Sequence, residues 1–212
     1  TNPQRPDRQY VGPFYDPMVT FSYLAGITQR IRDFTGILIL PAWPTALAAK
    51  QSAELAILSH GRFELGIGIS WNAAEYRALG RDIRGRGKRI EEQIAVLRRL
   101  WSEPYVTFEG RYHTLDKVGL NRVAIPPIPI WMGSESGEKA LRRVARWADG
   151  WMSLGDPLPD IPRLQQYMRE AGREPSKLKV RGPLVVGDDL KDTLERGRKL
   201  AAGGASHINI VA

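Results

Sequence analysis

The sequence predicts an α/β fold, a barrel of parallel strands with its helices outside, and three observations support this. Strand and helix patterns alternate along most of the chain, which is typical of a parallel sheet. The strands include near-continuous apolar runs such as Ile37–Leu40, as expected where both faces of a strand are buried. We count six strands, whereas a closed (β/α)8 TIM barrel has eight in about 250 residues. We therefore expect an incomplete barrel, with strands three to eight present and the first strand, first helix and second strand missing.

The first half of the chain shows these signals in a clear order. A polar stretch, Thr1–Gly12, precedes a helix that Asp16 can cap and Pro17 can start. The next elements are expected to be a strand, a helix capped by Thr45, a strand, a short helix and a long amphipathic helix, over Ile31–Leu40, Thr45–Ser59, Arg62–Ser70, Ala73–Leu79 and Lys88–Trp101. In the helix that Thr45 caps, Leu47, Leu55 and Leu58 are expected to face inward.

The second half resumes the alternation after an insertion. Tyr105–Leu115 predicts a hairpin that turns at Glu109-Gly110, inside an insertion around residues 104–125. Strands are then expected over Ile130–Met132, Trp151–Leu154, Leu178–Val186 and His207–Val211, and helices over Gly137–Ala148, Ile161–Ala171 and Asp188–Ala202. Because no linker interrupts the pattern, we expect residues 1–212 to form a single partial barrel domain.

Composition excludes several classes of protein and site. The chain has no cysteine, which rules out disulfides, thiolate metal sites and a cysteine nucleophile, and fits the cytoplasm. No apolar run approaches the roughly 18 residues of a membrane helix, and no histidine and carboxylate pair has the spacing of metal ligands. Although the net charge is +8, no aromatic residues alternate with the basic clusters, so we do not expect nucleic acid as a partner. Because no apolar run is long enough for a membrane helix, we do not expect a membrane as a partner either.

The active site of such a barrel lies at the carboxyl ends of its strands. That edge receives Trp43 from one loop and Ser70-Trp71-Asn72 from the next, and Trp43 and Trp71 are candidates for the walls of a substrate pocket. His60 and His207 fall at the opposite edge and His113 lies in the insertion, so no histidine is expected to be catalytic. The catalytic acid or base therefore stays unassigned, with Glu75 in the mouth loop as a remote candidate.

The most informative segment is the loop Gly133–Gly137, which joins a strand to a helix at this edge. Free backbone N–H groups at a helix N-terminus form a natural phosphate site, and Gly133, Ser134, Glu135, Ser136 and Gly137 supply that loop. Alternatively, Ser134 or Ser136 only caps the helix. We expect the loop to bind the phosphate of a cofactor.

Two further segments have a functional and a structural interpretation each. Asn72 can hydrogen-bond a cofactor or substrate, or it can cap its loop. Gly36 lies within a predicted strand, where glycine marks either a bulge with close ligand approach or a packing site inside the barrel.

Together these segments resemble the bacterial luciferase-like monooxygenase and oxidoreductase superfamily. The resemblance covers nearly the whole chain and runs through segments that begin at Tyr15, Thr35, Ala49, Arg89, Pro126 and Ala148. It implies a TIM barrel of the luciferase-like type that binds reduced FMN or the deazaflavin F420. It also implies a non-prolyl cis peptide at Gly36-Ile37, cofactor contacts from Thr35, Gly36, Ile37 and Asn72, and the phosphate loop Gly133–Gly137.

The stretch Gly66–Asn72 is most similar to the F420-dependent branch, so F420 is the expected cofactor and FMN the alternative. The expected activity is hydride transfer between this cofactor and a small organic substrate. The alternatives are an FMN-dependent monooxygenase and a non-catalytic flavin-binding barrel remnant. The basic segment Arg81–Arg89 either lines the anionic tail of the deazaflavin or is a solvated helix start. Unpaired strand edges in a partial barrel also predict a homo-oligomer.

Overall fold

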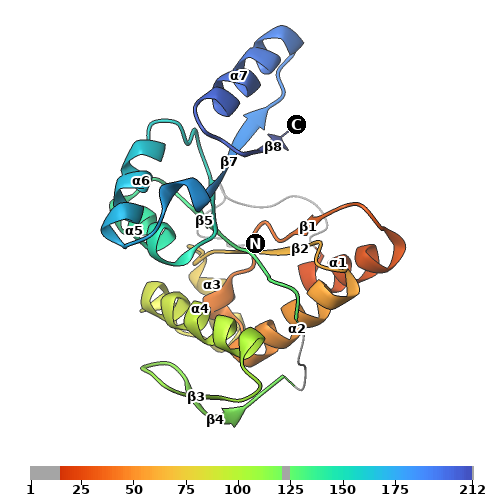
Figure 1. Ribbon diagram of the computed structural model, residues 1–212, viewed down its shortest axis with the longest axis vertical. Coiled ribbons are helices and arrows are strands. Elements are labelled where there is room, and N and C mark those ends of the chain that lie inside the picture. Colours follow the sequence, from red (N-terminus) through yellow and green to blue (C-terminus); the bar gives the residue numbers. More distant parts are fainter. Residues whose placement is uncertain (1–14, 121–124, 212) are drawn as a thin grey trace. The chain divides into compact units, whose positions relative to one another are not determined.

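The computed structural model describes residues 15–120 and 125–211, so the polar stretch Thr1–Gly12 lies outside the described residues. The chain divides into two compact units, residues 1–128 and 129–212, and each is described by itself (Figure 1). Whether the two form the single domain expected from the sequence stays a prediction. Among the described residues, no helix is long and apolar enough to cross a membrane.

The described residues of the first unit form two parallel strands, four α-helices and a hairpin (Figure 1). Its elements in chain order are α1 (Pro17–Ile27), β1 (Asp33–Phe34), the short 3-10 helix η2 (Leu40–Ala42), α2 (Thr45–Leu58), β2 (Phe63–Ile67), α3 (Ala73–Ala78), α4 (Arg86–Ser102), β3 (Val106–Glu109) and β4 (Thr114–Val118). Asp16 caps α1 through a 2.9 Å hydrogen bond from the Val19 N–H, as predicted. All five residues of β2 are buried, which confirms the interpretation of its apolar run.

The strand expected over Ile31–Leu40 is much shorter than predicted. Regular pairing with β2 ends at Phe34, a single parallel bridge at Leu38 resumes it, and η2 follows at Leu40. The interruption at Thr35–Ile37 is the bulge that Gly36 indicated as one of its two interpretations. The apolar run reflects burial rather than a continuous strand, because Leu38 and Leu40 are both buried although no regular strand pairing continues through them.

Two expectations for α2 were wrong. Thr45 is the first helical residue rather than the cap, and Pro44 takes the cap position without a side-chain hydrogen bond. Leu47 and Leu58 are exposed at 46% and 57%, whereas Leu55 is buried as expected. The buried stripe of α2 consists mostly of small residues, namely Ala48, Ala49, Ser52, Ala53 and Ala56. Small side chains let a helix lie close against its neighbours, so the leucine spacing was a misleading signal for the inward face.

Helix α4 carries the buried stripe that its spacing predicted. Ile90, Ile94 and Leu97 are fully buried, together with the polar Gln93. The antiparallel pairing of β3 with β4 confirms the predicted hairpin, and its being an insertion stays a prediction. Arg99 of α4 contacts the hairpin through a 3.0 Å hydrogen bond to the Thr107 carbonyl. The hairpin therefore packs against α4, and its two strands pair with each other and not with β1 or β2.

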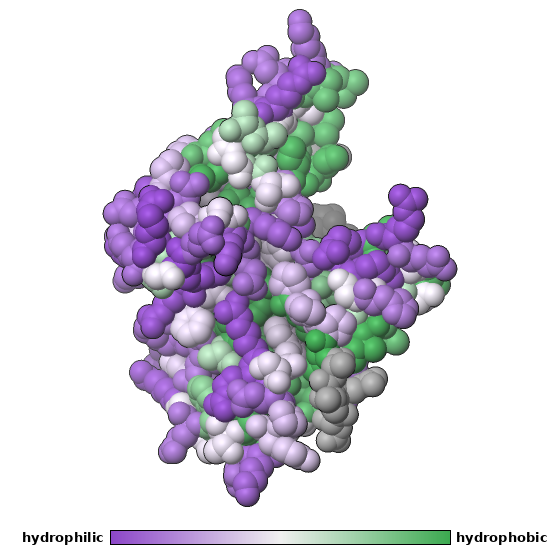
Figure 2. Space-filling view, viewed as in Figure 1, coloured by the Kyte–Doolittle hydropathy of each residue, from purple (hydrophilic) through white to green (hydrophobic). Residues whose placement is uncertain are grey.

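The second unit is a four-stranded parallel sheet with the strand order β5-β6-β7-β8. Its elements are β5 (Ile130–Ser134), α5 (Glu138–Trp147), β6 (Gly150–Ser153), α6 (Ile161–Glu170), the 3-10 helix η3 (Pro175–Lys177), β7 (Lys179–Val185), α7 (Leu190–Ala202) and β8 (His207–Val211). The strand–helix alternation and the parallel pairing within this unit match the prediction. Apolar side chains remain exposed around β7, α7 and β8, where Figure 2 shows a hydrophobic surface.

Candidate functional site

In the first unit, the bulge between β1 and β2 has a defined hydrogen-bond pattern. The Thr35 hydroxyl donates to the Gly66 carbonyl and accepts from the Gly66 N–H, both at 2.7 Å. The peptide bond between Gly36 and Ile37 is cis, as the family resemblance implied. A Cβ on Gly66 would lie 1.8 Å from the Thr35 carbonyl oxygen, so only glycine permits this approach. Gly36 is exposed, whereas the Thr35 side chain is fully buried and engaged with the backbone.

The segment after β2 turns sharply before the short helix α3. Ser70 has a left-handed backbone with φ of 51°, and Asn72 caps α3 by accepting a 3.1 Å hydrogen bond from the Ala74 N–H. The capping interpretation of Asn72 is therefore what the structure displays, and its contact with a cofactor stays a prediction. Tyr76 anchors the turn by donating to the Ile69 carbonyl at 2.8 Å, and burial raises its pKa to about 12. Burial also raises the pKa of the Glu75 carboxyl above its usual range.

In the second unit, the predicted phosphate loop follows the carboxyl end of β5. Ser134 is the last residue of the strand, and its hydroxyl accepts a 3.1 Å hydrogen bond from the indole N–H of Trp151. Gly137 takes the cap position of α5 without a side-chain hydrogen bond, so neither serine caps this helix. The first helical backbone bonds run from Ala140 and Leu141 back to the Gly137 carbonyl. The N–H groups of the first turn consequently face an exposed glycine-rich loop.

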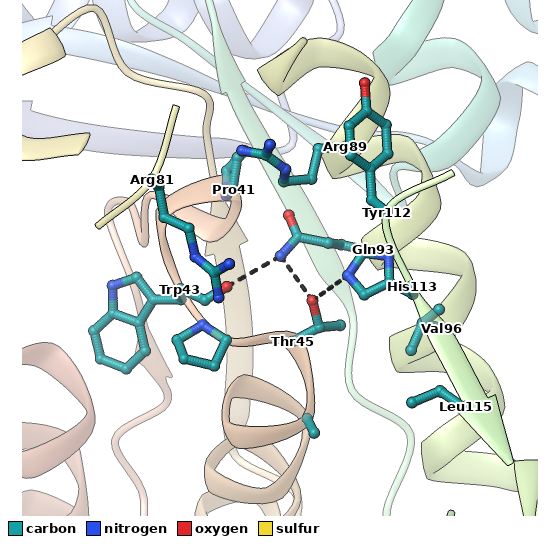
Figure 3. A pocket seen from close by; sticks show the side chains of 12 residues that line it. Pro41, Trp43, Thr45, Arg81, Arg89, Gln93, Val96, Tyr112, His113 and Leu115 are labelled. Carbon is teal, nitrogen blue, oxygen red and sulfur yellow. Dashed lines mark hydrogen bonds between the residues drawn. The ribbon is translucent and has the colours of Figure 1, made fainter. Parts of the chain in front are cut away.

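A cavity of about 230 Å³ lies in the first unit, between the start of α2, the first half of α4 and the hairpin turn (Figure 3). It is lined by Pro41, Trp43, Pro44, Thr45, Ala46, Arg81, Arg89, Gln93, Val96, Tyr112, His113 and Leu115. Of these residues, the sequence had singled out Trp43 as a pocket wall and the arginines as a basic rim. The sequence offered no signal for Thr45, Gln93 and His113, which come from three separate elements.

A chain of hydrogen bonds forms the floor of this cavity. The Gln93 amide nitrogen donates to the Thr45 hydroxyl at 2.9 Å and to the Leu40 and Trp43 carbonyls at 3.0 and 3.3 Å. The Thr45 hydroxyl lies 2.6 Å from His113 Nε2, and His113 Nδ1 lies 2.7 Å from Glu92. The chain therefore ties α2 and α4 to the hairpin turn.

Glu92 ends this chain and accepts three hydrogen bonds in total. Besides His113, the N–H groups of Arg111 and Tyr112 donate to it at 2.9 and 2.8 Å. Burial alone would raise the pKa of Glu92, but the hydrogen bonds from His113 and these two N–H groups outweigh it and lower the pKa below the usual range. Glu92 is thus held as a carboxylate whose oxygens are already occupied.

In the basic segment Arg81–Arg89, some cations pair with carboxylates and others lie at the cavity. Arg84 pairs with Asp82 at 2.8 Å and Lys88 with Glu91 at 3.4 Å, so these two fit the solvated helix start. Arg89 donates to the Asp82 carbonyl and lies 5.0 Å over the Tyr112 ring, at the cavity. Arg81 lines the same cavity, and its guanidinium has no hydrogen bond or ion pair within the described part of the chain.

The structure therefore places the predicted residues in separate groups. Trp43 lies in the cavity with Arg81 and Arg89, whereas Trp71 and Asn72 lie on the turn after β2. Thr35, Gly36 and Ile37 form the bulge, and Gly133–Gly137 belong to the second unit. Within residues 15–120 and 125–211 there is no group of three side chains able to hold a metal ion.

Comparisons with known proteins agree with this geometry. A protein of Mycobacterium tuberculosis of uncharacterized function is 38% identical over 166 residues, which is 76% of this chain and 57% of that protein. The F420-dependent hydroxymycolic acid dehydrogenase of the same organism is 32% identical over 181 residues, covering 82% of this chain and 50% of that enzyme. The chain thus spans about half the length of the curated relatives it matches.

A solved structure shows the same fold at lower sequence similarity. An F420-dependent secondary alcohol dehydrogenase, in complex with an F420-acetone adduct, aligns with a TM-score of 0.81 over 92% of this chain and 78% of that chain. Sequence identity is 19%, so this likeness concerns the fold and confirms the predicted α/β barrel class. The luciferase-like monooxygenase family matches residues 4–209, nearly the whole sequence. The chain belongs to the luciferase-like monooxygenase family.

Proposed function

We propose that this chain binds the deazaflavin F420 and serves in hydride transfer between it and a small organic substrate. The observation that carries the proposal is the amino end of α5, which lacks a side-chain cap and follows the exposed residues Glu135, Ser136 and Gly137. The positive end of a helix dipole with unsatisfied N–H groups favours an anion such as a phosphate group. The relatives named as F420-dependent enzymes support the same cofactor.

The start of α5 leaves room for a phosphate group. A Cβ built on Gly137 would meet nothing within 4 Å, so space is open beside the first turn. The Glu138 carboxylate is drawn toward Arg142 by a 2.8 Å ion pair along the helix, which reduces its repulsion of an anion. When bound, the deazaflavin supplies the hydride chemistry, and the protein supplies binding and orientation.

The roles of the first unit rest on the family resemblance. The exposed Gly36-Ile37 backbone and the turn at Asn72 are proposed contacts of the cofactor, and Trp71 is a proposed wall of the substrate pocket. The Thr35 hydroxyl is hydrogen-bonded to Gly66, so the proposed contact of Thr35 with the cofactor is made by its backbone. No residue of the chain is assigned as the catalytic acid or base.

The decisive variant is Gly137→Asp, which places a carboxylate where the phosphate is proposed to bind. Because Gly137 has an ordinary φ of −67° and open space, aspartate fits and caps α5. We expect the variant to gain roughly a few tenths of a kcal/mol in stability from the cap and about 0.3–1 kcal/mol more from the charge at the helix start, while F420 binding weakens about tenfold or more. Gly137→Asn is the matched control, since it caps without a charge and should weaken binding less.

Fluorescence titration with F420 and urea unfolding measure the two effects separately. Stability and affinity that change in opposite directions support an anion site at α5. Unchanged F420 affinity in the Gly137→Asp variant would reduce this loop to a strand–helix connection and remove the basis of the proposal.

A further inference from the structure

The cavity lined by Trp43, Arg81 and Gln93 has the features of a ligand site, and no residue of the segment Gly133–Gly137 lines it. Its volume of about 230 Å³ exceeds the roughly 30 Å³ that one water occupies, yet it falls below the roughly 300–1,000 Å³ of pockets for larger ligands. A site of this size suits an organic molecule of a few non-hydrogen atoms.

The cations around the cavity select for an acid. Arg81 reaches it with a guanidinium that no described carboxylate neutralises, and Arg89 lies beside it over Tyr112. The amino end of α2 also faces it through Pro44, Thr45 and Ala46, and Pro44 provides no side-chain cap. Nearby carboxylates are occupied, because Asp82 pairs with Arg84 and Glu92 accepts three hydrogen bonds. A carboxylate is therefore the favoured anion.

Gln93 adds a second requirement. Its amide nitrogen faces the Leu40 and Trp43 carbonyls, which can only accept hydrogen bonds, so the orientation of the amide is fixed. The amide oxygen points away from Thr45, toward the side chain of Arg89, as Figure 3 shows. Gln93 is 1% exposed, and this oxygen has no hydrogen-bond partner in the structure. An unpaired buried acceptor is costly, which favours a ligand that brings a donor.

We propose that this cavity binds a small carboxylic acid that carries a hydrogen-bond donor next to its carboxylate. The carboxylate lies between Arg81, Arg89 and the start of α2, and the hydroxyl or amide N–H of the ligand donates to Gln93 Oε1. Free hydroxy acids have this chemistry. So does an anionic tail with amide groups on the proposed cofactor, and only that second source rests on the proposed function.

Lactate and propionate are the matched probes, because they differ only in the hydroxyl group. Calorimetric titration of the 212-residue chain should show lactate binding about tenfold tighter than propionate, since one hydrogen bond to an otherwise unpaired buried group is at stake. Arg81→Gln should weaken lactate binding by about tenfold as well, because a charged hydrogen bond is lost. Arg77→Gln on α3 removes the same charge from a neighbouring position that does not line the cavity, and it should leave lactate binding unchanged.

Each outcome decides one part of the inference. Equal binding of lactate and propionate would overturn the role of Gln93, and equal effects of the two arginine variants would reduce the site to general surface charge. Absence of lactate binding would overturn the site itself. Titration of lactate in the presence of saturating F420 separates the sources: competition identifies the cofactor tail, and independent binding identifies a free acid. Failure of F420 to bind at all would count against the proposed function and leave the lactate result intact.

Discussion

Single residues in this chain often have a structural role where their sequence context suggested a chemical one. Asn72 caps α3, and the Thr35 hydroxyl replaces missing strand hydrogen bonds at the bulge. His113 was not expected to be catalytic, and the structure gives it a structural role between Glu92 and Thr45. A contact between residues 45, 92 and 113 depends on how distant elements pack, and no local pattern reports that packing.

The hydrogen bonds of Glu92 predict a pH-dependent contribution to stability. Its pKa is lowered in the folded chain, so the stabilisation is present above the ordinary value of about 4.5 and is lost as the pH falls through the folded value. Glu92→Gln should cost about 1–3 kcal/mol at pH 7 and much less near pH 3. Urea unfolding at both pH values measures this. The exposed Glu109→Gln of the same hairpin is the control, and an equal loss for Glu92→Gln at both pH values would contradict the account.

At the scale of elements, periodicity predicted the helices and strands better than their inward faces and ends. The stripe of α4 and the hairpin turn were predicted well, because a single long helix and a glycine turn are local features. The strand over Ile31–Leu40 was not, because the close approach of Thr35 to Gly66 breaks the pairing and joins residues about 30 positions apart. The inward face of α2 was missed for a similar reason, since small residues pack where leucines were expected.

The close contact at Gly66 predicts that adding one methyl group there lowers the free energy of unfolding markedly. In Gly66→Ala the new methyl group would collide with the Thr35 carbonyl oxygen and the Phe34 ring, and both are held by the surrounding strands. We expect a loss of about 1–3 kcal/mol or more in the free energy of unfolding. Gly26→Ala is the control within the same unit: it lies in α1 with nothing within 4 Å and should gain about 0.5–1 kcal/mol. Similar values for the two variants in urea unfolding would refute the close approach.

At the scale of the whole chain, the sequence predicted the fold class and the family, which depend on the order of many elements. Parallel pairing of β1 with β2 and of β5 through β8 matches that prediction. The choice between F420 and FMN is of another kind, because it depends on how a few side chains meet the ligand. Substrate identity and self-association likewise depend on surfaces that the alternation of strands and helices does not describe.

The exposed apolar surface near β8 predicts that the chain associates with itself. Ile210 is 75% exposed on β8, which pairs with β7 alone among the described strands, and Leu190 and Leu194 of α7 are also exposed (Figure 2). Because an apolar edge strand is a site of association, Ile210→Lys should shift the chain toward the monomer in sedimentation velocity. Leu58 of α2 is also exposed but lies on a helix and not on a strand edge, so Leu58→Lys should shift the chain less toward the monomer. A monomeric parent chain would contradict this prediction.

The assignment of F420 as the cofactor is tested by measuring the affinity of the chain for F420 and for FMN side by side at two salt concentrations. The account predicts tighter binding of F420, and an affinity that falls as salt rises because exposed charge pairs are screened beyond about 8–10 Å. Equal or tighter binding of FMN would contradict the assignment of the cofactor, and binding of neither would contradict the proposed function.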